Sequence, residues 1–122
     1  LVDTWGSEGS HRWYQRDIYD AAMERFAEWD NVRLIRGSVP EILGTVPTDA
    51  VGYLTLDMNG DEAERAALEY FWPRLIRGAV IYIDDFNRHR YSRQRELIRD
   101  FLRDKKERLL NFPSGNALII KD

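Results

Sequence analysis

Two short apolar stretches that end in acidic residues decide the fold: YLTLDMN at residues 53–59 and AVIYIDD at residues 79–85. An amphipathic segment, about Glu62 to Arg77, lies between them, and the three predict a strand, a helix and a second strand. A right-handed crossover of this kind makes the two strands parallel. Parallel strands bring their carboxyl ends to one edge of the sheet, where open α/β sheets bind ligands. Three carboxylates are therefore expected at this edge: Asp57, Asp84 and Asp85.

Size and composition indicate one compact domain, residues 1–122, with 43% hydrophobic residues for a core. The 18 Lys and Arg against 21 Asp and Glu give a net charge of -3, which argues against nucleic acid as a partner. No apolar run approaches the ~20 residues of a membrane helix, so no membrane association is expected. The chain has no cysteine, which excludes disulfides and thiolate chemistry and fits a cytoplasmic protein.

The remaining segments alternate between strand and helix patterns. A helix is expected from about Asp17, with Ile18, Ala22, Phe26 and Trp29 as packing positions on one face. A second, charged helix is expected from Arg93 to Lys106. The other expected elements are strands at Leu1–Thr4, Val32–Ile35, Leu109–Phe112 and Ala117–Ile120 and a helical turn at Val39–Leu43. This order predicts an α/β fold whose sheet is mainly parallel with an antiparallel C-terminal edge.

The aspartate set is suited to holding a hard divalent cation. Magnesium prefers oxygen ligands and keeps several waters, so two or three carboxylates suffice. Neighbouring carboxylates repel one another unless a cation or a proton intervenes. For a single aspartate, capping of the following helix explains the residue better. For Asp57, Asp84 and Asp85 together, a metal site is the stronger interpretation, and Asn59 would add an amide oxygen.

Other candidates have ordinary explanations beside functional ones. Asp3 ends the first strand, where an acid in nucleotide-binding folds receives ribose hydroxyls, although a turn role fits as well. Gly37 and Ser38 would let a flat ligand approach the backbone, or would form a plain tight turn. His89, four residues after Asp85, would serve as a base or position the substrate, or is a solvated loop residue, and His11 falls in another such loop.

Several blocks of the chain together resemble one family. They are LVDTW at residues 1–5, VRLIRGSVP at 32–40, LDMN at 56–59, ALEYFWPRL at 67–75, IDDF at 83–86, and FPSG with LIIK at 112–121. The chain resembles the class I S-adenosylmethionine-dependent methyltransferases, in the branch similar to macrocin O-methyltransferase. These enzymes methylate sugar hydroxyls, so the resemblance implies a Rossmann-like sheet, S-adenosylmethionine, magnesium and a sugar or polyol acceptor.

The resemblance also implies residue roles. Asp57, Asp84 and Asp85 fall on the family's magnesium ligands, and Asp3 falls on its ribose-binding acid. Bound metal would lower the pKa of the acceptor hydroxyl, and Asp57 or His89 would take the proton. Much of the rate acceleration would come from holding both reactants at attack distance.

The resemblance has one large gap. The family's first strand and its glycine-rich loop would precede Leu1, and no such stretch occurs here. That strand belongs in the middle of the sheet, between the strands expected at Leu1–Thr4 and Tyr53–Asp57, and its loss would leave two unpaired inner edges. The chain is therefore expected to be a partial domain of a longer enzyme, or one completed by a partner chain or a second copy.

The leading hypothesis is a magnesium-assisted, S-adenosylmethionine-dependent O-methyltransferase. The alternative from a different class is a non-catalytic interaction module derived from such an enzyme, because the cofactor loop is missing. A third and weaker hypothesis is a metal-dependent hydrolase that uses the same aspartates. No phosphate-binding loop supports the third hypothesis.

Overall fold

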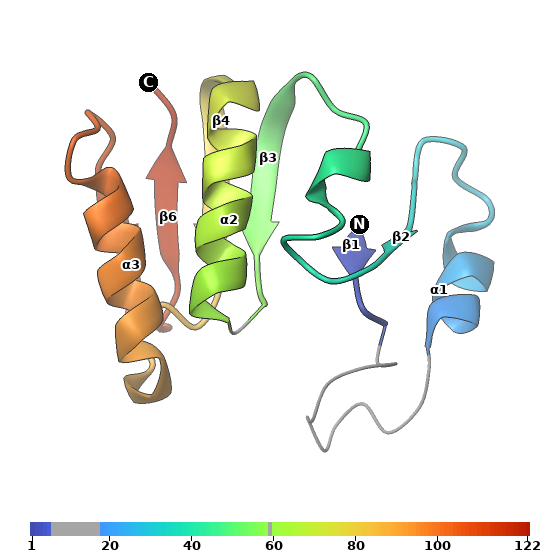
Figure 1. Cartoon of the computed structure of the whole chain (residues 1–122), viewed down its shortest axis with the longest axis horizontal. Coiled ribbons are helices and arrows are strands. Elements are labelled where there is room, and N and C mark those ends of the chain that lie inside the picture. Colours follow the sequence, from blue (N-terminus) through green and yellow to red (C-terminus); the bar gives the residue numbers. More distant parts are fainter. Residues whose placement is uncertain (6–17, 59) are drawn as a thin grey trace. The chain divides into compact units, whose positions relative to one another are not determined.

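The computed structural model describes residues 1–5, 18–58 and 60–122 (Figure 1). These residues form two compact units, residues 1–46 and residues 47–122, each of which is described by itself. The described strands form two sheets, one of two strands and one of four. The expectation of one domain over residues 1–122 stays a prediction.

The first unit is built around a short parallel strand pair. Its elements are β1 (Val2–Asp3), α1 (Tyr19–Phe26), β2 (Ile35–Arg36) and the short 3₁₀ helix η1 (Leu43–Thr45). The pairing of β1 with β2 places Asp3 opposite Arg36. The expected parallel strands are therefore confirmed, and the helix lies between them in the chain.

Two details of this unit differ from the expectation. The strand begins at Ile35, not at Val32, because the Val32 amide donates to the Trp29 carbonyl in a turn (3.1 Å). Helix α1 ends at Phe26, so Trp29 lies beyond the helix and is 43% exposed. The expectation of Trp29 as a packing residue on the helix face was therefore wrong, although its ring contacts that of Phe26. Asp17, the expected helix start, lies outside the described residues.

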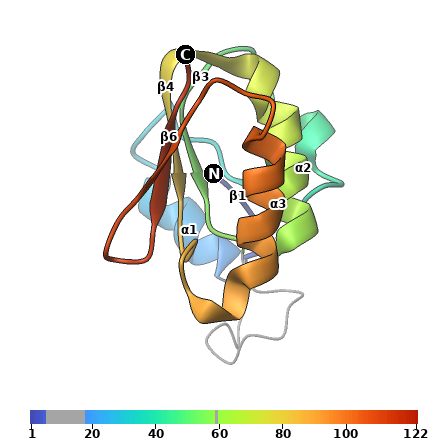
Figure 2. The same cartoon turned by 90° about the vertical axis from the view of Figure 1, so that its left-hand side faces the viewer.

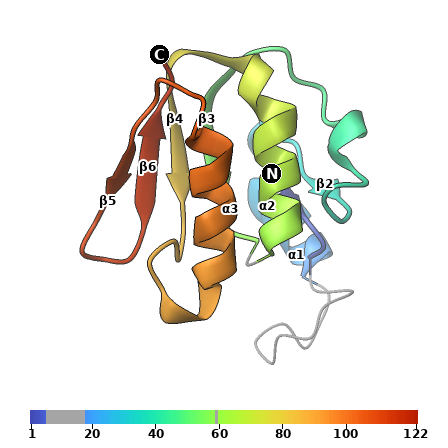
Figure 3. The same ribbon diagram turned by 60° about the vertical axis from the view of Figure 1, so that its left-hand side comes forward.

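The second unit is a four-stranded sheet with two long helices. Its elements are β3 (Val51–Leu56), α2 (Asp61–Phe71), η2 (Trp72–Arg74), β4 (Leu75–Ile83), η3 (His89–Tyr91), α3 (Ser92–Leu102), β5 (Leu109–Asn111) and β6 (Ala117–Ile120). The strand order is β3-β4-β6-β5 (Figure 3). Strand β4 pairs parallel with β3 and antiparallel with β6, and β6 pairs antiparallel with β5. The strand–helix–strand unit and the antiparallel C-terminal edge are confirmed.

Strand β4 is longer than expected and carries an irregularity. Pro73 lacks an amide hydrogen, and the helical pattern continues beyond α2 only as η2, so β4 begins at Leu75 and not at Ala79. The register with β3 shifts between Val51 and Tyr53, where β4 holds extra residues. Gly78 lies in this stretch with a φ of 81°, which a glycine adopts without steric cost.

The core lies between one face of this sheet and the two helices. Helices α2 and α3 both lie on that face (Figure 2). The strands alternate, so every second side chain points to the helices. The largest buried apolar side chains of this core are Leu56, Leu68, Ile81, Ile83, Phe86, Ile98 and Ile119. On the other face of the sheet, Tyr53 is 63% exposed. Among the described helices, none is long and apolar enough to cross a membrane.

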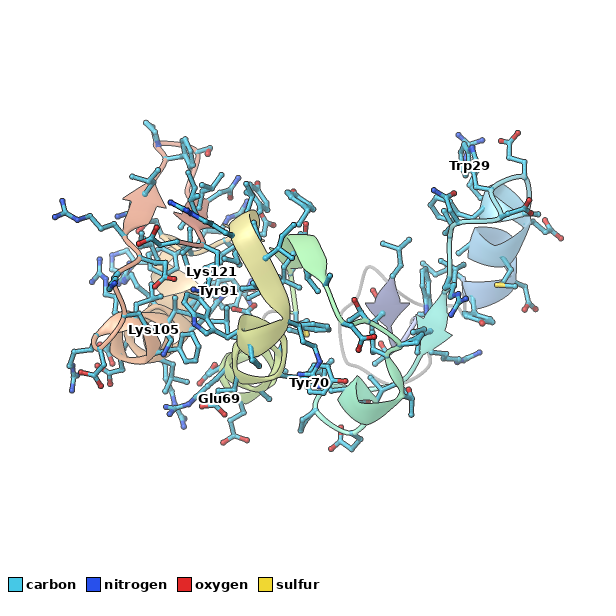
Figure 4. All side chains as sticks on the ribbon, turned by 90° about the horizontal axis from the view of Figure 1, so that it is seen from above. Trp29, Glu69, Tyr70, Tyr91, Lys105 and Lys121 are labelled. Atoms are coloured by element: carbon cyan, nitrogen blue, oxygen red, sulfur yellow. The ribbon has the colours of Figure 1, made fainter. Side chains whose placement is uncertain are left out.

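An ion pair closes the end of the sheet where β6 finishes. The Lys121 ammonium binds the carboxylate of Glu107, and both Lys121 and Lys105 lie over the Trp72 ring. The two lysines are labelled in Figure 4. Burial alone would raise the pKa of Glu107, but hydrogen bonds from Lys121 and from backbone amides outweigh burial and hold this pKa below its ordinary value of 4.5. The charged carboxylate is therefore favoured by folding.

This ion pair gives a pH-dependent contribution to stability. Because the pKa of Glu107 is lowered in the folded chain, the contribution is complete above pH 4.5 and is lost as the pH falls through the folded pKa. The Glu107→Gln variant should be less stable than wild type at neutral pH, and the difference should shrink as the solution is acidified below 4.5. Urea unfolding at a series of pH values measures this. A difference in unfolding free energy that stays constant with pH would contradict the assignment.

Candidate functional site

The carboxyl ends of β3 and β4 bring two of the predicted site residues together. The pairing places Leu56 beside Ile83, so the next residues, Asp57 and Asp84, follow neighbouring strands at one edge. The Asp84 amide donates to the Leu56 carbonyl at 2.9 Å, which extends the pairing one residue beyond the strands. Asp57 is exposed and Asp84 is half-buried. The crossover expected from the sequence therefore yields a pair of carboxylates at the carboxyl edge.

Tyr82 belongs to this edge and was not singled out from the sequence. Its hydroxyl lies 3.5 Å from Oδ1 of Asp84, a long hydrogen bond, and accepts one from the Asn116 side-chain amide. Burial, followed by the negative charge of Asp84 and the hydrogen bond to it, raises the pKa of the Tyr82 phenol above its ordinary value of 10.0. Tyr53 and Asp57 add to this effect. The phenol therefore stays protonated and can donate to the carboxylate. Its alternation with apolar neighbours in β4 gave no signal of this role.

Asp85 is held differently from its neighbour. Its φ is 53°, in the left-handed region that aspartate tolerates better than most residues. Its carboxylate, with only 16% of the side chain exposed, pairs with the Arg88 guanidinium at 2.7 Å. The next residue, Phe86, is fully buried and anchors the turn. The turn thus directs Asp85 to an arginine three residues later.

The donor set can be compared with what magnesium requires. Within the described ranges, no group of three or more histidine, aspartate or glutamate side chains is placed to hold a metal ion. Asp57 and Asp84 supply two carboxylates from adjacent strand ends, and magnesium is commonly bound through one or two carboxylates with waters completing its octahedron. Asp85 would join only by exchanging its arginine for the cation. The pair therefore fits magnesium, and the three-aspartate site stays a prediction.

The histidines and Asn59 are less well connected to this edge. His89 lies in η3 and is exposed, and its side chain forms no hydrogen bond or ion pair with the other described residues. His11 and Asn59 lie outside the described residues. His89 as a base therefore also stays a prediction.

The predicted cofactor residues lie together at the carboxyl end of the β1–β2 pair. The Gly37 amide donates to the Asp3 carbonyl at 3.1 Å, and Oδ1 of Asp3 accepts from the Trp5 amide at 2.8 Å. Ser38 follows directly and is exposed. The Asp3 carboxylate thus caps a turn while remaining exposed, so its turn role is real and compatible with ligand binding.

The close approach at Gly37 is made by the chain itself. A Cβ at this position would lie 2.8 Å from Cγ1 and 2.9 Å from Cβ of Ile42, far inside normal contact distance. The space beside Gly37 is filled by a branched side chain of the following turn. This supports the plain tight-turn interpretation of the glycine more than approach of a flat ligand.

A buried polar pair was also missed from the sequence. Glu64 of α2 and Gln94 of α3 are each only 1% exposed, and the Gln94 amide donates to the Glu64 carboxylate. Oε1 of Gln94 is buried without a hydrogen-bond partner among the described residues, which costs ~1–3 kcal/mol. Charged residues at helical spacing usually predict a solvated face, so the pattern concealed this pair.

A family model described as a methyltransferase domain matches residues 1–86. The chain belongs to this methyltransferase family. The match takes in β1 to β4 and all the predicted site residues except His89. A comparison with curated proteins found no match.

Solved structures of O-methyltransferases share the fold. The structure of the O-methyltransferase NovP is similar over 98% of this chain and 55% of its own, with a TM-score of 0.77 and 17% identity. The calicheamicin methyltransferase CalS11 is similar over 98% of this chain and 58% of its own, with a TM-score of 0.73 and 18% identity. An apo structure of CalS11, described as a TDP-rhamnose 3'-O-methyltransferase, covers 71% of this chain and 40% of its own, with a TM-score of 0.59 and 22% identity.

These likenesses confirm the expected Rossmann-like methyltransferase fold. The chain spans only about half the length of the methyltransferase structures that it matches. The activity and substrates of the whole protein are therefore taken up below as proposals.

The packing of Ile42 against Gly37 predicts a stability effect. Gly37→Ala should lower the free energy of unfolding by about 1–3 kcal/mol, because the new methyl group overpacks the turn. Gly44→Ala is the matched control, since a Cβ there meets nothing within 4 Å, and should change stability by less than ~0.5 kcal/mol. Denaturant unfolding of both variants measures this. Equal stability of the two variants would contradict the packing account.

Proposed function

We propose that the protein containing this chain is an S-adenosylmethionine-dependent O-methyltransferase that acts on a sugar or polyol hydroxyl with the help of magnesium. The observation that carries the proposal is that Asp57 and Asp84 follow neighbouring strands at the carboxyl edge of a methyltransferase-family sheet. The sugar substrate named for CalS11, a structural neighbour, supports the class of acceptor.

Asp57 and Asp84 are the residues that would hold magnesium, with Asp85 as a third ligand once it leaves Arg88. Bound magnesium would lower the pKa of an acceptor hydroxyl. The protein's own task is to orient that hydroxyl and accept its proton. Tyr82 would help to orient the Asp84 carboxylate, because its protonated phenol donates a hydrogen bond to Oδ1 of Asp84.

The proposed reaction would move one methyl group from the sulfonium sulfur to the acceptor oxygen. Bound S-adenosylmethionine would supply the methyl group and would leave as S-adenosylhomocysteine, and a base of this chain would accept the proton of the acceptor hydroxyl. Holding the oxygen and the methyl group in line at attack distance would supply much of the acceleration. Asp57 and His89 are the two candidates for the base.

Cofactor contacts are proposed for the first unit. The exposed carboxylate of Asp3 would receive the ribose hydroxyls, with Ser38 beside it. Gly37 would contribute by forming the tight turn that leads to Ser38, because Ile42 occupies the space next to its Cα.

The aspartate pair gives the first functional prediction. In the full chain to which this sequence belongs, Asp57→Asn with Asp84→Asn should abolish magnesium-dependent methyl transfer to sugar acceptors. The loss should exceed the ~10–100-fold that removal of an outer-shell partner costs. Asp100→Asn, an exposed aspartate on α3, is the control and should retain activity. Methyl transfer from labelled S-adenosylmethionine, with and without chelator, measures this. Undiminished, chelator-insensitive turnover in the double variant would refute the metal role.

The identity of the base gives a separate prediction. If His89 takes the proton, His89→Ala should lower kcat while magnesium affinity stays unchanged. If Asp57 takes it, His89→Ala should leave kcat near wild type. Measuring kcat and the magnesium dependence of this single variant separates the two. A His89→Ala variant that loses magnesium affinity would contradict both assignments.

A further inference from the structure

The most unusual group outside the proposed site is the buried carboxylate of Glu64. Glutamate is almost never fully buried unless it is paired, yet Glu64 is only 1% exposed. It lies in the first turn of α2, the helix that connects β3 to β4. A buried carboxylate in this position requires an explanation that packing alone does not provide.

Glu64 joins three segments of the second unit. Its Oε1 accepts a hydrogen bond from the Met58 amide at 3.3 Å, and its Oε2 accepts one from the side chain of Gln94 in α3. Its own backbone amide donates to the Gly60 carbonyl at 2.9 Å. One residue therefore holds both Met58 and Gly60, in the connection that leads from β3 into α2.

This connection begins with Asp57. On one side, the Leu56 carbonyl is fixed by the amide of Asp84 at 2.9 Å. On the other side, the Met58 amide is fixed by Glu64. The backbone of Asp57 is thus held from both neighbours, and its position relative to Asp84 depends on both contacts.

We propose that Glu64 and Gln94 form a positioning clamp for the metal site, which sets where Asp57 stands beside Asp84. The inference rests on the proposed function, because it assigns a second layer of support to the proposed magnesium ligand. Outer-shell partners of this kind orient metal ligands. Glu64 itself does not touch the reacting atoms.

Helix packing by itself does not account for the clamp. Arg93 and Asp61 already join the same two helices through an ion pair of 3.0 Å at the surface. Gln94 also leaves its Oε1 without a partner among the described residues, so the pair is a poor device for stability alone. What the clamp adds is the contact with the Met58 amide, which the surface pair does not make.

The first test observes the clamp directly, in the full chain. Amide hydrogen exchange of Met58 should be slow in wild type and about 10-fold faster in Glu64→Leu, which fills the space but removes the acceptor. Leu102→Ala is the matched control, since this buried residue of α3 lies at the other end of the helix and should destabilise the chain without accelerating Met58 selectively. Unchanged Met58 exchange in Glu64→Leu would overturn the proposal.

The second test measures the affinity for Mn²⁺, a spectroscopic substitute for magnesium. Glu64→Leu should weaken Mn²⁺ binding ~10–100-fold, whereas Leu102→Ala should not. Glu64→Gln retains an acceptor for Met58 and, once the Gln94 amide rotates, a hydrogen bond between the helices, so it should restore affinity close to wild type.

The outcomes separate this inference from the proposed function. Wild-type Mn²⁺ binding that depends on Asp57 but is unaffected by Glu64→Leu overturns the clamp alone. Absence of Mn²⁺ binding in wild type overturns the metal site, and the positioning role with it. Equal loss of affinity in Glu64→Leu and Leu102→Ala would show a general effect of stability and would also overturn the clamp.

Discussion

The parallel pairing of β3 with β4 is the constraint on which the site depends. Leu56 lies beside Ile83 at the end of the pairing. The residues that follow the two strands, Asp57 and Asp84, therefore become neighbours. The hydrogen bond from the Asp84 amide to Leu56 carries the pairing past the strand ends. The buried face of the same two strands packs under α2 and α3, so the fold that forms the core also presents the carboxylates.

Three kinds of support converge on this edge. Tyr82 reaches Asp84 from the sheet, and Asn116 in the C-terminal hairpin donates to the Tyr82 hydroxyl. Glu64 reaches the connection after Asp57 from the helices. A carboxylate pair held from several directions is suited to one cation in one place, because its ligands do not have to be ordered on binding. The methyltransferase family match gives this geometry a chemical context.

The sequence predicted the elements well and the side-chain partners poorly. Strong hydrophobic periodicity predicted β3, α2 and β6. The right-handed crossover made β3 and β4 parallel, which predicted that Asp57 lies beside Asp84. The start of β4 at Leu75 was hidden because the strand opens directly after a proline-containing turn and contains Gly78. The pairing of Asp85 with Arg88 depends on a left-handed turn, and the burial of Glu64 depends on α3, which is distant in the chain. The spacing of charged residues along the chain predicts neither the left-handed turn nor the burial.

We propose that Asp57 and Asp84 together form one cation site at the carboxyl edge of β3 and β4. Substoichiometric Mn²⁺, which broadens the signals of nearby backbone amides, tests this proposal in the full chain. Amides around Asp57 and Asp84 should broaden first. The amide of Leu75, at the opposite end of β4, should stay sharp because the length of the strand separates it from the ion. Broadening that spares Asp57 and Asp84, or that affects Leu75 equally, would contradict the proposed site.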